Sequence, residues 1–135
     1  LSVVRGKFPG GHAWRFVING RPVFLRGANW VPADILPGRV TETDYRRLLE
    51  QAKAAGINFL RVWGGGLREK QAFWATCDRL GIMAWQEFPL ACAFFDHYPR
   101  DRAYLAALAT EARGIVRALR NHPSLIAWCG GNEIN

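Results

Sequence analysis

Three segments with helical spacing alternate with short apolar segments along this chain, and this alternation restricts the fold more than any other feature. The first helix is expected to begin at Thr41, where residues 41–44 resemble a capping box, and to end at Gly56. The second ends at Gly81, and the third begins near Asp101, has Leu105 among the apolar residues of its inner face and ends before Pro123. Each helix is followed by a predicted buried strand, at residues 57–63, 82–88 and 125–129. Strands joined by helices pair in parallel, so this pattern predicts an α/β fold in which helices cover a parallel sheet.

The segment before the first helix predicts a β-hairpin. Residues 15–19 and 23–26 are short extended stretches, and Gly20-Arg21-Pro22 between them offers a turn. The second stretch is expected to lead into the main sheet. Because the chain starts at Leu1 without a signal-peptide pattern, residues 1–15 are expected to be a tail that enters from a preceding domain. Residues 16–135 are then the partial domain built on the parallel sheet.

Two parallel-sheet architectures fit this order of elements, a doubly wound sheet and a (β/α)8 TIM barrel. No phosphate-binding glycine motif follows any predicted strand, and Gly64-Gly65-Gly66 lacks the required spacing. Polar and aromatic residues instead collect where each strand ends: Asn29, Trp30 and Asp34, then Arg61 and Trp63, then Gln86 and Glu87, and finally Asn132 and Glu133. In a barrel these ends meet on one face. A whole barrel takes roughly 250 residues, so the sequence predicts the N-terminal half of a TIM barrel, with about four βα units preceded by the hairpin.

Composition excludes several classes of partner. The chain carries 18 Lys and Arg against 11 Asp and Glu, but Arg46 and Arg47 form its only adjacent basic pair and no nucleic-acid motif accompanies the charge. We therefore expect no nucleic-acid partner. No apolar run approaches the roughly 18 residues that a membrane helix needs, so no membrane partner is expected either. The three cysteines and three histidines are scattered, which predicts buried free thiols, no metal and no cofactor. Nothing in the sequence assigns a compartment or an oligomeric state.

Four ordered motifs, at residues 24–30, 61–66, 85–88 and 121–133, resemble the catalytic barrel of the β-mannosidases of glycoside hydrolase family 2. The resemblance implies that Glu133 is the general acid/base and that Asn132 binds the 2-hydroxyl of the sugar. It implies a retaining exo-glycosidase whose substrate is a glycoside or oligosaccharide with a terminal β-D-mannose. The nucleophile is then a second Glu from a later strand, and the 135-residue chain alone is expected to be inactive.

The resemblance also gives roles to the other strand-end residues. Arg61 would lie near the nucleophile, Trp63 would form an aromatic wall of the sugar pocket, and Glu87 would support the site through hydrogen bonds. Asn29, Trp30 and Asp34 are expected among the substrate-binding residues, together with Arg61, Trp63, Glu87 and Asn132. The same three residues favour the mannosidase branch over the galactosidase and glucuronidase branches.

Simpler structural roles remain open for several of these residues. Arg61 could merely pair with Glu87, and Trp30 and Trp63 could be core aromatics; Trp85 and Trp128 are expected in the core rather than in the site. Another family 2 activity, of the exo-β-glucosaminidase or β-galactosidase type, stays an alternative. So does a non-catalytic sugar-binding module that uses Trp30 and Trp63 as stacking platforms.

Overall fold

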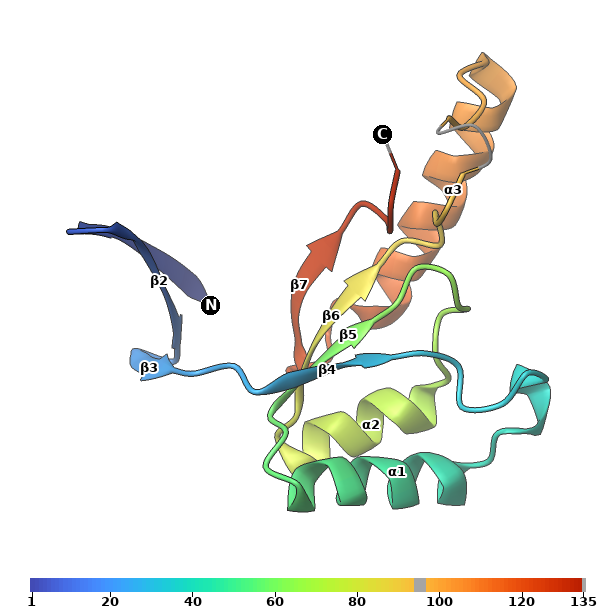
Figure 1. Ribbon diagram of the computed structural model, residues 1–135. Helices are drawn as coiled ribbons and strands as arrows, with labels where there is room; N and C mark the ends of the chain where they lie inside the picture. Colours follow the sequence, from blue (N-terminus) through green and yellow to red (C-terminus); the bar gives the residue numbers. More distant parts are fainter. Residues whose placement is uncertain (94–96, 135) are drawn as a thin grey trace.

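The computed structural model describes residues 1–93 and 97–134, which contain two β-sheets joined by residues 24–26 (Figure 1). The first sheet is antiparallel, with strands β1 (Ser2–Phe8), β2 (Gly11–Ile18) and β3 (Arg21–Val23) in that order. The second is parallel, with strands β4 (Gly27–Trp30), β5 (Phe59–Val62), β6 (Met83–Glu87) and β7 (Leu125–Cys129). Helices α1 (Glu42–Ala54), α2 (Gln71–Leu80) and α3 (Arg102–Leu119) connect the strands of the second sheet, and a short 3-10 helix, η1 (Pro37–Arg39), precedes α1.

The predicted hairpin is confirmed, but its turn lies earlier than expected. Asn19 and Gly20 both have positive φ values, 50° and 78°, which is the backbone that a tight two-residue hairpin turn needs. Pro22 therefore belongs to β3, an edge strand, where its missing N–H breaks no ladder. Residues 1–15, expected as a tail, form β1 and the start of β2 and pair with each other. Their assignment to a preceding domain stays a prediction.

The expected helix ends are confirmed at three positions. Thr41 caps α1 with both bonds of a capping box, because its hydroxyl accepts from the Asp44 N–H and its own N–H donates to the Asp44 carboxylate. Gly81 closes α2 in the left-handed conformation at φ 66°. Asp101 caps α3 by accepting from the N–H of Tyr104 at 2.9 Å.

The order of the parallel strands separates the two architectures that the sequence left open. The strands lie side by side in chain order, β4-β5-β6-β7. A doubly wound sheet reverses its strand order partway, whereas a barrel adds each strand beside the one before. The chain is thus an α/β segment of a TIM barrel, as expected.

The core lies between this sheet and the helices, and α1 and α2 lie side by side along it in Figure 1. Alternate strand residues, among them Leu60, Val62 and Ala84, point into this core. In α3 only Ile115 and Leu119, near its end, are buried. Leu105, expected on the inner face of α3, is 49% exposed because the buried contacts of α3 come from its second half.

Two further expectations about buried side chains were partly wrong. Cys77 is fully buried, and burial raises the pKa of its thiol to about 12, but Cys92 is exposed. Trp128, expected in the core, is 38% exposed and stacks on Phe88, because it lies on the last strand of the sheet. Within the described residues no helix is long and apolar enough to cross a bilayer.

Candidate active site

Asn29, Arg61 and Glu87, three of the polar residues predicted at the strand ends, lie on the face of the sheet that the helices do not cover, whereas Gln86 is buried on the core side, where it is paired with Val62. Asn29 of β4 is paired directly with Arg61 of β5, and Arg61 with Trp85 of β6. Residues paired in a parallel sheet project from the same face, and their neighbours in the strand project from the other. Asn29, Arg61 and Trp85 line one open pocket, which corresponds to the interior of a barrel.

Arg61 connects the ends of all four parallel strands. Its Nε donates to Glu87 Oε1 at 2.7 Å, and its Nη1 donates to Asn29 Oδ1 at 3.2 Å. Its Nη2 donates to Asn132 Oδ1, just after β7, at 2.6 Å. The planar guanidinium suits such a hub because its donors have a fixed geometry and its charge is permanent.

Glu87 is a buried carboxylate that is bonded to its neighbours in the protein. Its side chain is 1% exposed, and the bond from Arg61 compensates its charge. Its Oε1 also accepts from the indole of Trp85 at 3.3 Å, and its Oε2 accepts from the Gly64 N–H at 2.8 Å. A Cβ at Gly64 would stand 2.6 Å from the Phe88 carbonyl oxygen, so this close approach of two loops needs glycine. Both carboxylate oxygens therefore accept hydrogen bonds from other groups of the protein.

The amide of Asn132 has a defined orientation. Its oxygen must face Arg61, because a guanidinium only donates, and its Nδ2 then donates to the Cys92 sulfur at 3.4 Å. An amide nitrogen carries two hydrogens, so one further donor remains on Asn132 for a ligand. Asn132 itself is 8% exposed.

Glu133 stands next to this amide in a strained backbone conformation. Its φ is 49°, in the left-handed region that non-glycine residues adopt at a cost of about 1–3 kcal/mol and that clusters at functional sites. Its side chain is exposed, and its Oε2 accepts from the Cys92 thiol at 3.5 Å. The main chain before it is fixed by two bonds, Asn132 N–H to the Leu90 carbonyl at 2.8 Å and Cys92 N–H to the Asn132 carbonyl at 3.0 Å.

The structure does not bring Trp30 into the Arg61 cluster, the group of side chains that are hydrogen-bonded to Arg61. Its ring lies 4.8 Å from that of Phe73 in the core, and its indole N–H donates to Glu69 Oε1 at 2.9 Å. Glu69 also accepts from the hydroxyl of Tyr45, whose pKa is raised by burial and by this carboxylate, so the hydroxyl stays a donor. Trp30 directly follows Asn29 in β4, and adjacent strand residues point to opposite faces.

Asp34 and Trp63 also make contacts outside the Arg61 cluster. Asp34 Oδ1 accepts from the Leu36 N–H at 2.8 Å, and its Oδ2 lies 4.0 Å from Arg39 Nε, so its carboxylate stabilises the loop after β4. The Trp63 indole lies directly over Gly65, where an added Cβ would be 2.1 Å from the ring. The loop thus holds the ring at the carboxyl end of β5.

Two residues in the cluster were not assigned to it from the sequence. Trp85, expected in the core, donates to Glu87 and lies in the open pocket with Arg61; the pairing of β5 with β6 could have predicted this placement. Cys92 contacts both Asn132 and Glu133, although it is 40 or more residues away in the chain, and no pattern in the sequence predicts the contact.

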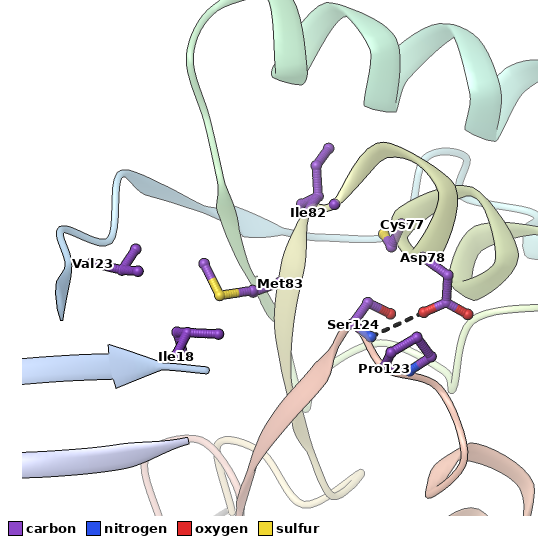
Figure 2. A pocket seen from close by; sticks show the side chains of 9 residues that line it. Ile18, Val23, Cys77, Asp78, Ile82, Met83, Pro123 and Ser124 are labelled. Atoms are coloured by element: carbon purple, nitrogen blue, oxygen red, sulfur yellow. Dashed lines mark hydrogen bonds between the residues drawn. The ribbon is translucent and has the colours of Figure 1, made fainter. Parts of the chain in front are cut away.

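A separate pocket of about 320 Å³ lies at the opposite edge of the sheet, between the hairpin and the start of β6 (Figure 2). Ile18 and Val23 face Ile82 and Met83 across it, and the Asp78 carboxylate accepts from the Ser124 N–H at 2.9 Å. In TIM barrels this amino-terminal edge serves stability, while chemistry takes place at the carboxyl edge. Within residues 1–93 and 97–134, no group of three His, Cys, Asp or Glu side chains is placed to hold a metal ion.

Comparisons with known proteins agree with the fold of this chain. The family model of the TIM barrel domain of glycosyl hydrolases family 2 matches residues 12–135. A β-mannosidase from Bos taurus is 47% identical over 91% of this chain, and this chain spans 14% of that relative's length. The crystal structure of a β-D-mannosidase from Dictyoglomus thermophilum matches with a TM-score of 0.85 at 50% identity, covering 96% of this chain and 16% of that one. A Bacteroides uniformis β-glucuronidase matches with a TM-score of 0.73 at 32% identity, covering 92% and 14%.

Proposed function

The chain belongs to glycosyl hydrolase family 2, and on this premise we propose that the full-length protein is a retaining exo-glycosidase that removes terminal β-D-mannose from non-reducing ends. The observation that carries the proposal is the Asn132–Glu133 pair, held at the carboxyl edge of the sheet by Arg61 and by the segment around Cys92. The relatives with the highest identities described above are β-mannosidases, at 47% and 50%, whereas the β-glucuronidase is 32% identical. These identities favour mannose among the sugars that the family accepts.

Glu133 is the proposed general acid/base. Its exposed carboxyl group can approach the glycosidic oxygen of a bound substrate and protonate it as the bond to the leaving group breaks. In the second half of a retaining reaction the same carboxylate removes a proton from the water that hydrolyses the glycosyl-enzyme intermediate. The remaining amide hydrogen of Asn132 is suited to a bond with the sugar 2-hydroxyl, which strengthens in the oxocarbenium-like transition state.

Glu87 is not the proposed nucleophile, because both its oxygens accept hydrogen bonds from protein groups and its side chain is almost completely buried. A nucleophile must instead direct a free lone pair at the anomeric carbon. We assign that role to a second Glu on a later strand of the full barrel. The 135-residue chain by itself is therefore expected not to turn over substrate, and hydrolysis by the purified chain would contradict this assignment.

A non-catalytic sugar-binding module fits less well. It would need Trp30 as a stacking platform, but the Trp30 ring packs against Phe73 and its N–H is bonded to Glu69.

The test uses the full-length protein and aryl β-glycosides. We expect hydrolysis of phenyl β-mannoside with a much smaller kcat/KM on the matching glucosaminide, galactoside and glucuronide; the reverse order would reassign the substrate within the family. Glu133→Ala should lower kcat/KM on phenyl β-mannoside by about 100-fold or more, since general acid catalysis contributes about 10²–10⁴-fold. Glu50→Ala, at an exposed position on α1, is the control and should leave the rate unchanged. A Glu133→Ala variant with full turnover on this poor leaving group would overturn the assigned role.

A further inference from the structure

Cys92 contacts both members of the Asn132–Glu133 pair. Its thiol donates to Glu133 Oε2 at 3.5 Å, and its sulfur accepts from Asn132 Nδ2 at 3.4 Å. One side chain on the segment after β6 thus connects two side chains that follow β7.

The main chain fixes the position of this thiol. A single parallel bridge joins Ala91 to Asn132, with Asn132 N–H bonded to the Leu90 carbonyl and Cys92 N–H bonded to the Asn132 carbonyl. Cys92 and Glu133 both have φ of 49°, a conformation that non-glycine residues keep only where the surrounding contacts enforce it. The two strained residues therefore face each other across a bridge that holds their backbones at a fixed separation.

The chemistry of a thiol suits a residue that orients an acid/base. A Lys or Arg at this place would make a short charge-assisted bond to the carboxylate and would oppose its protonation. A thiol is a weak donor and a weak acceptor, so it can restrain the direction of the carboxyl group while leaving it free to gain and lose a proton. Its second contact, from Asn132, completes a chain of bonds that runs from Arg61 through Asn132 and Cys92 to Glu133.

We propose that Cys92 is a positioning residue that holds the Glu133 carboxyl group in line with the leaving-group oxygen through its thiol. This inference rests on the proposed function, because it presupposes that Glu133 is the acid. Proton donation matters for a poor leaving group and hardly at all for one that departs as a stable anion. The decrease in rate caused by removing Cys92 must then depend on the leaving group, whereas the decrease caused by a general structural defect would be the same for both kinds of substrate.

The experiment compares two substrates on the full-length protein, phenyl β-mannoside and 2,4-dinitrophenyl β-mannoside. For Cys92→Ala we expect kcat/KM on the phenyl substrate to fall about 10- to 100-fold, a part of the full contribution of an acid catalyst. On the dinitrophenyl substrate we expect a change within about twofold. Cys92→Gly removes the same thiol in a residue that accepts positive φ without strain, so it replaces the alanine variant if that variant folds poorly. Cys92→Ser keeps a donor and an acceptor and should recover most of the phenyl rate.

The results distinguish a failure of the role proposed for Cys92 from a failure of the role proposed for Glu133. If Glu133→Ala discriminates between the two substrates but both thiol-free variants lower the two rates equally, or lower neither, Cys92 does not position the acid. If Glu133→Ala itself shows no discrimination, the assigned role of Glu133 fails first. Equal losses on both substrates would indicate that Cys92 acts only through Asn132, whose sugar contact serves every leaving group, and this too would overturn the proposal.

Discussion

The sharpest structural prediction concerns two adjacent glycines before the Asn132–Glu133 pair. A Cβ added at Gly131 would stand 2.6 Å from the Leu90 carbonyl oxygen and 3.0 Å from Leu90 Cβ. A Cβ added at Gly130 would meet nothing within 4 Å. Neither glycine has a positive φ, so the two alanine substitutions differ in space and not in backbone strain.

The size of the effect follows from these distances. Ordinary contact begins at 3.4 Å, so the Leu90 carbonyl must move by about 0.8 Å to accept an alanine at position 131. That carbonyl accepts the Asn132 N–H, and its displacement shifts the segment that carries Glu133. Catalytic groups must be held to within about 0.5 Å, and a displacement near 1 Å can cost about 100-fold in rate. Overpacking of this kind also costs about 1–3 kcal/mol of stability.

We therefore expect Gly131→Ala to lower kcat/KM on phenyl β-mannoside by about 10- to 100-fold and to lower the melting temperature measurably. Gly130→Ala should stay within about twofold in rate, with a stability change within about 0.5 kcal/mol. The assays are steady-state kinetics and differential scanning calorimetry on the full-length protein. Equal effects of the two substitutions would refute the argument, because only one position has a close neighbour.

Three further predictions test the contacts around the site. Arg61→Met should destabilise the protein by about 2–4 kcal/mol, somewhat less than for a fully buried pair because the Arg61 side chain is 28% exposed, and adding Glu87→Gln should restore part of this loss in denaturant unfolding. Burial raises the pKa of Asp78, but hydrogen bonds from His122 and Ser124 outweigh it and hold the pKa below its ordinary value. The stabilisation by Asp78 should therefore be present at neutral pH and lost as the pH falls through that lowered pKa, so that the melting-temperature gap between wild type and Asp78→Asn narrows in acid. Trp30→Phe should cost about 1–2 kcal/mol in unfolding by losing the bond to Glu69, yet leave KM for the mannoside within about twofold; a large rise in KM would instead place Trp30 in the sugar pocket.

The sequence predicted the parallel sheet segment well because its signals are local. The capping box at Thr41, the cap at Asp101 and the left-handed Gly81 each lie where the sequence placed them. These are interactions within one turn of chain, so the residue types alone are informative. The strand β1 was not predicted because its sequence has no strong apolar alternation. Only its pairing with β2 in the structure identifies it as a strand.

The contacts among the candidate site residues depend on tertiary geometry and were predicted less completely. Period-two alternation in β4 could have separated Asn29, which contacts Arg61, from Trp30, which lies in the core. The contact of Cys92 with Glu133 could not be predicted, because it depends on the bridge between the segments after β6 and β7. Leu105 was misplaced because helical spacing identifies an apolar face but not which turns of α3 the sheet covers.

The most direct test of the role of Glu133 measures how added azide changes the rate and the product when the full-length Glu133→Ala variant hydrolyses 2,4-dinitrophenyl β-mannoside. If Glu133 is the acid/base of a retaining reaction, the activated substrate still forms the glycosyl-enzyme intermediate, but its hydrolysis is slow. Azide needs no general base, so we expect it to raise kcat and to yield β-mannosyl azide, with the configuration of the substrate, by proton NMR. An α-configured azide, or a variant whose rate azide does not change, would contradict the role assigned to Glu133.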